Sequence, residues 1–148
     1  MKELILKTYK IAVQRGWNCT FWAIDIHDVI IKSNYKAGDI PTEFLGDSKK
    51  VLQRISLRND IVLILYTCSY PNEIEQYLEL FRNNKINFKY VNENPECLNT
   101  GFGFFEKKFY FNVLFEDKAG FIPERDWPLV TEALDIIDAQ IDSFYSLP

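Results

Sequence analysis

The sequence predicts a three-layer, Rossmann-like α/β fold with a mostly parallel central sheet and helices on both of its faces. Apolar runs of strand length alternate with segments of helical period, which is typical of parallel strands joined by right-handed crossovers. The run IVLILY at residues 61–66 is apolar on both faces, as a central parallel strand would be. A length of 148 residues is enough for one sizeable core, so we expect a single domain over residues 1–148.

The chain is expected to begin with a helix over residues 2–15, followed by a strand over residues 21–26. Apolar residues recur at roughly helical spacing in the first range, and Gly16 supplies a stop at its end. In the second range the apolar run FWAI leads directly into Asp25. Residues 32–47 contain glycines and a proline without a clear period, which indicates a loop.

Two helix–strand pairs are predicted in the middle of the chain. The first pair is a helix over residues 49–58, with one apolar face, and the strand over 61–66. The second pair begins with a helix near Pro71, a residue suited to a first helical turn, which extends to Asn83. A strand over residues 86–91 completes this second pair.

The C-terminal third is expected to hold a loop, a strand and a closing helix. The loop covers residues 92–106 and is rich in Asn, Pro and Gly. The strand covers residues 109–115 and runs directly into Glu116 and Asp117. The helix covers residues 129–144 and follows two prolines. Three side chains of the loop are expected to dock on the body of the protein: Phe102, Phe104 and Phe105.

Charge and composition argue against several classes of protein. The net charge of −4 and the pI of about 5.1 disfavour a non-specific nucleic-acid binder. No apolar run approaches the ~20 residues of a membrane span, and the N-terminus lacks the apolar run of a secretion signal. The three cysteines form no CxxC pair, so we expect neither a disulfide framework nor a zinc site. We therefore expect the protein to work in a reducing, cytoplasmic setting.

Polar side chains follow three of the predicted strands. Asp25 ends the first strand, and Thr67 follows the second. Glu116 and Asp117 follow the last strand, and a pair of lysines precedes it. Ligands of open α/β sheets bind where the carboxyl ends of the strands meet, so we expect these groups to lie together. A carboxylate at such a place is costly unless it is paired, hydrogen-bonded or bound to a cation, which suggests a use for Asp25.

In this order the residues resemble the four motifs of the haloacid dehalogenase-like hydrolase superfamily. The first motif, an aspartate followed two residues later by another, corresponds to the segment DIHDV at 25–29. The second, an apolar strand ending in Thr or Ser, corresponds to 61–67. The third, a lysine, corresponds to Lys107 or Lys108. The fourth, an acidic pair after an apolar strand, corresponds to 113–117, so the resemblance covers most of the chain.

The resemblance implies an Mg²⁺-dependent phosphohydrolase that works on a phosphorylated substrate through an aspartyl-phosphate. Asp25 would be the nucleophile, and water would then hydrolyse the acyl phosphate. Asp25 would also bind Mg²⁺, since hard oxygen ligands suit this ion. The remaining ligands would be the backbone carbonyl of His27 and a carboxylate of Glu116 or Asp117. The phosphoryl group would be held by four residues, with the first lysine preferred: Thr67, Cys68, Lys107 and Lys108.

The sequence departs from the family pattern at His27. Phosphatases of the family normally place there a second aspartate, which protonates the leaving group and then activates water. A histidine can do both, so His27 is a candidate general acid and base. The alternative is a catalytically inactive binding or scaffold protein on the same fold.

The chain is also expected to lack the cap domain that members of the family usually carry. Both places for a cap, residues 32–47 and 92–106, are about one loop long. An open site admits large substrates or needs a protein partner to close it. The phenylalanine-rich stretch 102–105 is the candidate lid. The substrate class stays open among sugar phosphates, nucleotides, nucleic-acid termini and phosphoproteins.

Other hydrolytic chemistries lack their residues in this sequence. HD metal phosphohydrolases need several histidines, and the chain has one. A cysteine phosphatase needs an arginine six residues after its cysteine, and no cysteine of the chain has one there. The sequence contains neither a GxxxxGK nucleotide loop nor the nucleophile elbow of a serine hydrolase.

Overall fold

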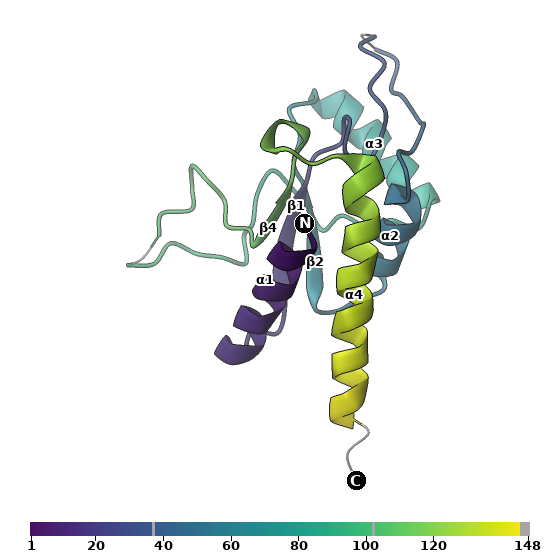
Figure 1. Cartoon of the computed structure of the whole chain (residues 1–148). Helices are drawn as coiled ribbons and strands as arrows, with labels where there is room; N and C mark the ends of the chain where they lie inside the picture. Colours follow the sequence, from purple (N-terminus) through teal and green to yellow (C-terminus); the bar gives the residue numbers. More distant parts are fainter. Residues whose placement is uncertain (37, 102, 146–148) are drawn as a thin grey trace.

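The computed structural model describes residues 1–36, 38–101 and 103–145, which form a Rossmann-like α/β fold around a parallel sheet (Figure 1). The predicted Rossmann-like α/β fold class with its parallel central sheet is confirmed. The strands are β1 (Thr20–Ile24), β2 (Ile61–Leu65), β3 (Tyr90–Val91) and β4 (Val113–Phe115). Their order in the sheet is β3-β2-β1-β4, and every pairing is parallel. Because β1 lies between β2 and β4, Asp25 follows a central strand.

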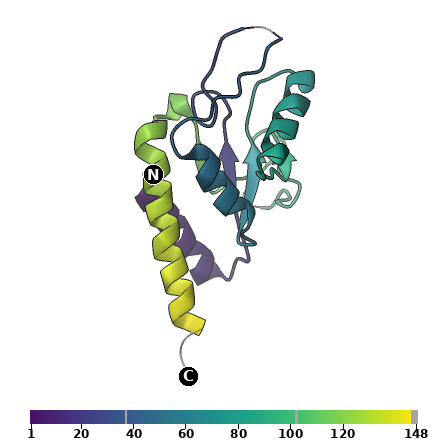
Figure 2. The same cartoon turned by 90° about the vertical axis from the view of Figure 1, so that its right-hand side faces the viewer.

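The helices are α1 (Lys2–Arg15), α2 (Ser48–Ser56), α3 (Pro71–Asn83), the short 3₁₀ helix η1 (Asp117–Ala119) and α4 (Pro123–Tyr145). The first three match the predicted helical segments to within two residues at each end. Helices α1 and α4 lie side by side in both views, and the C-terminal turns of α4 extend beyond the sheet (Figure 2). No helix among the described residues combines the length and the apolar character needed to cross a bilayer.

An aromatic stack between the sheet and α4 fixes the chain just after β1. The ring of Phe115 in β4 lies 5.5 Å from Trp22 of β1 and 5.6 Å from Trp127 of α4, measured between centroids. All three side chains are at most 2% exposed. The indole N–H of Trp127 donates a hydrogen bond of 2.9 Å to the carbonyl of Val29. The turn that carries Asp25 and His27 is therefore anchored on both sides, by Trp22 of β1 before it and by the hydrogen bond of Trp127 to Val29 after it.

The other face of the sheet is covered by the segment between β3 and β4. The ring of Phe21 contacts Tyr110 of this segment edge to face, at 6.3 Å between centroids. Asn112 closes the arrangement, because its backbone N–H donates to the carbonyl of Phe21 and its side-chain oxygen accepts from the N–H of Phe21. Residues further out in the segment project away from the body, at the left of Figure 1.

The last two strands are shorter than the sequence predicts. Residues 86–89 do not belong to β3, because the N–H of Ile86 bonds to the carbonyl of Phe81 and closes the end of α3. The predicted strand over 109–115 is reduced to Val113–Phe115, because aromatic side chains of its first half pack on the sheet instead. Tertiary contacts override β propensity in both places.

The closing helix begins six residues earlier than the predicted start at 129, and the prediction was wrong on this point. Pro123 occupies the first turn, where a missing N–H costs nothing, and the Asp126 carboxylate accepts from the N–H of Ile122. Pro128 lies inside the helix. It is exposed, so the carbonyl of Glu124 that lost its donor can bond to water instead.

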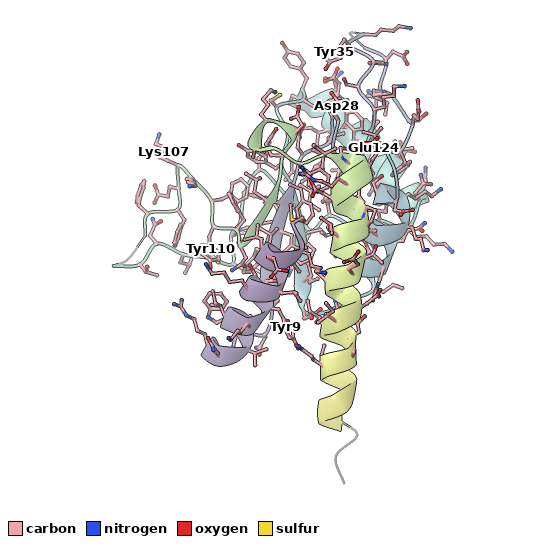
Figure 3. All side chains as sticks on the ribbon, viewed as in Figure 1. Tyr9, Asp28, Tyr35, Lys107, Tyr110 and Glu124 are labelled. Atoms are coloured by element: carbon pink, nitrogen blue, oxygen red, sulfur yellow. The ribbon has the colours of Figure 1, made fainter. Side chains whose placement is uncertain are left out.

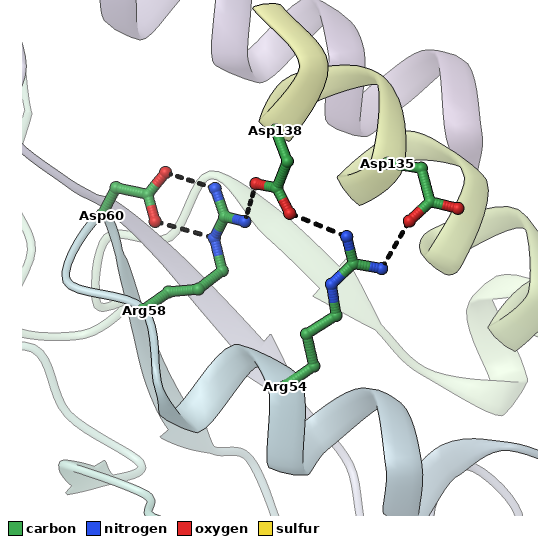
Figure 4. Close-up of polar contacts among 5 residues, drawn as sticks. All are labelled: Arg54, Arg58, Asp60, Asp135 and Asp138. Atoms are coloured by element: carbon green, nitrogen blue, oxygen red, sulfur yellow. Dashed lines mark hydrogen bonds and ion pairs between the residues drawn. The ribbon is translucent and has the colours of Figure 1, made fainter. Parts of the chain in front are cut away.

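Helices α2 and α4 are joined by a chain of ion pairs (Figure 4). Arg54 donates to Asp135 and to Asp138, each at 2.7 Å. Arg58 donates to Asp60 through both its Nε and Nη2 atoms, each at 2.8 Å, and also pairs with Asp138. The Arg58 side chain is only 12% exposed, so this arginine is the centre of the network.

Candidate metal and phosphate site

Asp25 lies at the carboxyl end of β1, where its backbone continues the sheet by one residue. The N–H of Asp25 donates to the carbonyl of Phe115 in β4 at 2.9 Å. On the other side, the N–H of Tyr66 donates to the carbonyl of Ile24 at 2.9 Å. Both neighbouring strands thus fix the backbone at Asp25, as the sequence predicts for a strand-end carboxylate.

Three carboxylates gather at this edge of the sheet. One oxygen each of Asp25, Glu116 and Asp117 lies within 4.8 Å of the others. Glu116 follows β4 directly and precedes η1, whose turn is closed by hydrogen bonds from the N–H groups of Ala119 and Phe121 to the carbonyl of Glu116. The parallel pairing of β1 with β4 therefore brings together acidic residues that are distant in the sequence.

The electrostatics of the cluster favour protonation when no cation is present. Burial raises the pKa of Asp25 from its ordinary 3.8 to about 6, and the charge of Asp117 raises it further. Burial also raises the pKa of Glu116 from 4.5 to about 7, together with a hydrogen bond to Asp117 and the charge of Asp25. Carboxylates so placed repel each other, and a bound divalent cation would remove this repulsion.

The three residues fit the donor set that Mg²⁺ requires. Each offers a hard carboxylate oxygen, and Mg²⁺ binds through a few carboxylates while keeping water and substrate oxygens as further ligands. Neither histidine nitrogen nor thiolate sulfur belongs to this cluster, so the donor set favours magnesium over zinc.

A cavity of about 450 Å³ opens beside the carboxylates. Asp25, His27 and Asp117 are among the residues that line it. Residues 33–36, residues 39–41 and helix α3 also line it, with Tyr35, Lys36 and Tyr77 among the lining side chains. The labelled side chains of Asp28 and Tyr35 lie at this end of the molecule, while Lys107 lies far from them (Figure 3).

His27 lines the same cavity as Asp25 and is held by α3. Its Nε2 atom lies 2.8 Å from the hydroxyl of Tyr77, and the two rings meet edge to face. Asp28 lines the same cavity but is bound to its own loop: its oxygens accept from the N–H and hydroxyl of Ser33 and from the hydroxyl of Tyr35. Asp28 thus fixes the loop after β1.

Thr67 and Cys68 follow β2, as predicted, but their environments differ. The Thr67 hydroxyl donates to the Ser69 hydroxyl at 3.0 Å and accepts from the N–H of Ser69. Asn92 binds the backbone of Thr67 through both of its amide atoms. Cys68 is exposed and lines the cavity beside Asp25. Thr67 is 8% exposed, and its hydroxyl stabilises the loop after β2 through its hydrogen bonds with Ser69.

The predicted lysines are not brought to the carboxylates. Lys107 lines a different cavity, with Asn92 and Phe109, and Lys108 is exposed on the same projecting segment. Two other lysines, Lys36 and Lys118, line the cavity of Asp25, and the charge of Lys118 lowers the pKa of Asp25. The sequence offered a signal for Lys118, since it directly follows the acidic pair in a turn at a strand end.

The phenylalanines of the projecting segment behave differently from one another. Phe105 packs edge to face on Tyr110, as expected of a docked side chain. Phe104 is 60% exposed, so the expectation that it docks on the body was wrong. Phe102 lies outside the described residues. Phe105 lines two cavities of this segment, and neither of them contains Asp25.

Comparisons with known proteins support the fold. No protein-family model and no curated protein matches the chain. Among solved structures, it is similar to a conserved protein from Bacteroides thetaiotaomicron, with a TM-score of 0.62 and 20% sequence identity. The match covers 80% of this chain and 91% of that one. At this identity the likeness shows the fold alone, which is the α/β arrangement described above.

Proposed function

We propose that the protein is a magnesium-dependent phosphohydrolase of the haloacid dehalogenase-like type, with Asp25 as its nucleophile. The observation that carries the proposal is the cluster of Asp25, Glu116 and Asp117 within 4.8 Å beside a cavity at the carboxyl ends of β1 and β4. The resemblance of the strand-end residues to the family motifs supports the same function. Mg²⁺ held by these carboxylates would neutralise charge on the phosphoryl oxygens.

The chain's own residues would carry the reaction in two steps. A carboxylate oxygen of Asp25 bonds to phosphorus, and the ester P–O bond breaks as the leaving oxygen takes a proton from His27. In the second step His27 takes a proton from water, whose oxygen attacks the aspartyl-phosphate. Inorganic phosphate leaves and the Asp25 carboxylate is restored. Both residues line one cavity, which suits these roles.

The phosphoryl group would be held by Lys118 in place of Lys107. Only the first of these two lysines lines the cavity of Asp25, and its charge favours the ionised Asp25 carboxylate. A phosphoryl group brings about two negative charges to three carboxylates, so an ammonium group beside Mg²⁺ lowers the repulsion. Among the described residues no ion pair occupies the Lys118 side chain, so its ammonium group can bind phosphate.

The proposal is tested by hydrolysis of an aryl phosphate in the presence of Mg²⁺. We expect turnover by the wild type and its loss in Asp25→Asn, since the amide is not a nucleophile. Asp47→Asn is the matched control, because Asp47 is exposed at the start of α2 and its side chain caps no helix N–H. Absence of turnover with a broad panel of phosphate esters, from about pH 5 to about pH 9, would exclude the enzyme.

The alternative function is a binding or scaffold protein that does not turn over phosphate. The hydrogen bonds of Thr67 to Ser69 favour it, because a hydroxyl already engaged is not available to a phosphoryl oxygen. In that case Mg²⁺ still binds to the carboxylates while no phosphate ester is cleaved. Calorimetric titration of Mg²⁺ into the inactive protein identifies this outcome.

The open cavity bears on the size of the substrate, and the free thiols bear on the cellular compartment of the protein. We infer that the phosphorylated substrate is large or that a protein partner closes the cavity, since the cavity lined by residues 33–36, residues 39–41 and α3 is open to solvent. Cys19, Cys68 and Cys97 are free thiols, which suits a reducing compartment such as the cytoplasm.

A further inference from the structure

Tyr35 lines the cavity of Asp25 and leaves its ring in solvent. The residue is 90% exposed, although an aromatic ring normally contributes to stability by being buried. The other tyrosine that lines this cavity, Tyr77, is 2% exposed and stacks on Phe81. Of these two rings, that of Tyr35 is the one with its faces accessible to a molecule that enters the cavity.

The Tyr35 side chain is nevertheless tied to the loop after β1 (Figure 3). Its hydroxyl donates a hydrogen bond of 3.2 Å to Asp28, whose carboxylate also accepts from the N–H and hydroxyl of Ser33. The backbone of Tyr35 has a φ of 52°, in the left-handed region that is unfavourable for a bulky residue. A ring that is solvated and carried on strained backbone adds little to the stability of the fold, and this combination indicates a use in binding.

The cavity has room for more than a phosphoryl group. Its volume of about 450 Å³ lies within the range of roughly 300–1,000 Å³ that is typical of small-molecule sites. A phosphoryl group bound beside Asp25 leaves the rest of this volume to the alcohol part of the substrate. A planar ring in that part can stack on the ring of Tyr35, whereas a saturated sugar or alkyl group lacks the π system for this contact.

We propose that Tyr35 determines specificity by stacking on an aromatic ring in the alcohol part of a phosphate monoester. The inference rests on the proposed function, because it names the class of substrate that the Asp25 site accepts. Tyr35 contacts the substrate but takes no part in bond breaking. The aromatic ring can be a nucleobase or a phenol ring, and phosphates of saturated sugars are disfavoured.

The kinetic test uses benzyl phosphate and cyclohexylmethyl phosphate, which have similar sizes and similar leaving alcohols and differ in aromaticity. We expect the wild type with Mg²⁺ to hydrolyse benzyl phosphate with a kcat/KM about tenfold higher, as for one ring contact. Tyr35→Leu should bring this ratio close to one, mainly through KM, because stacking acts on bound substrate and transition state alike. Tyr35→Phe keeps the ring and should keep most of the preference.

Tyr70→Leu is the matched control, because Tyr70 is 75% exposed and is not among the residues that line the cavity. It should leave the ratio at the wild-type value. Adenosine 5′-monophosphate and free phosphotyrosine then distinguish the two sources of the ring. The substrate whose kcat/KM falls about tenfold in Tyr35→Leu identifies the source, and a fall for neither of them overturns the inference.

Binding of phosphonates, which are not hydrolysed, separates this inference from the proposed function. Benzylphosphonate and cyclohexylmethylphosphonate are titrated into the protein with Mg²⁺ in a calorimeter, and we expect a Kd about tenfold lower for the first. A wild type without turnover, but with a preference that Tyr35→Leu removes, overturns the phosphohydrolase and supports the aromatic site. Equal preferences in the wild type and Tyr35→Leu overturn the inference whatever the protein catalyses, and so does the absence of binding by both phosphonates.

Discussion

At the scale of single residues, the site is defined by carboxyl groups that are costly to ionise. The pKa of Asp25 is raised to about 6 and that of Glu116 to about 7, chiefly by burial. Residues that are unfavourable for the metal-free fold and yet lie on the edge of a rigid sheet are typical of functional sites. The two pKa shifts lead to a testable prediction about the stability of the protein.

The stability of the metal-free protein should fall as pH rises through the neutral range. The folded-state pKa values of Asp25 and Glu116 lie above their ordinary 3.8 and 4.5, so the folded protein binds more protons than the unfolded chain. The contribution is fully present below about pH 4 and is lost as pH rises through about 6 to 7. Urea unfolding in a chelator measures this trend.

The Asp25→Asn variant isolates the contribution of one carboxyl. It should match the wild type near pH 4 and be more stable by about 1 kcal/mol at pH 8, because the amide has no charge to desolvate. Subtraction of the two curves removes the titration of all other groups. A difference that does not change with pH would show that Asp25 is not destabilised by its charge.

Lys118→Met tests which lysine binds the phosphoryl group. It should reduce kcat/KM for the aryl phosphate about 100-fold, as for loss of one charge-stabilising donor, and weaken inhibition by inorganic phosphate. Lys107→Met should have little effect, since Lys107 lines another cavity. Lys36→Met removes the same charge from another residue that lines the Asp25 cavity, and it controls for the general electrostatic potential of the cavity. Larger losses in Lys107→Met would return the role to that residue.

At the scale of elements, Arg58 joins α2, the start of β2 and α4. Replacement by Met leaves Asp60 without its arginine partner and Asp138 paired with Arg54 alone, and should lower the free energy of unfolding by about 2 kcal/mol. Arg54→Met is the matched control. Arg54 side chain is 33% exposed, so its loss should cost about 1 kcal/mol or less. Urea unfolding at low and high salt measures both, and equal costs would contradict a central role for Arg58.

The sequence predicted those helices and strands whose ends are marked by residues adjacent in the chain. The stop at Gly16, the apolar run of β2 and the proline at the start of α3 are signals carried by adjacent residues, and the structure matches them. The start of α4 was missed because Asp126 and Trp127 anchor a turn whose prolines suggest a break. Periodicity does not report such side-chain anchors.

The candidate site was predictable where sheet topology alone decides it. Asp25, Glu116 and Asp117 meet because β1 pairs with β4, and strand ends in the sequence already indicated this. The predicted lysine, Lys107, lines another cavity than Asp25, because motif order does not show that residues 98–101 and 103–108 lie on a segment that projects from the body. The contact of His27 with Tyr77 depends on the packing of α3, which no local pattern contains.

At the scale of the whole molecule, Mg²⁺ should act as a cross-link between the two halves of the chain. The three carboxylates proposed to bind it follow β1 and β4, strands that are far apart in the sequence and adjacent in the sheet. The unfolded chain does not bring these carboxylates together, so an ion that binds them favours the folded state. At about 100 times its Kd, such an ion stabilises the fold by about 2.7 kcal/mol, which corresponds to a Tm increase of roughly 5–10 °C.

This stabilisation separates a metal site from a cluster of repelling carboxylates without any need for a substrate. Thermal unfolding of the wild type is followed with saturating Mg²⁺ and with NaCl at matched ionic strength. Asp25→Asn should raise the Tm of the metal-free protein and abolish the increase that Mg²⁺ causes, while Asp47→Asn should keep both at wild-type values. If NaCl stabilises the wild type as much as Mg²⁺ does, the carboxylates need only screening. The magnesium site would then have to be abandoned together with the phosphohydrolase.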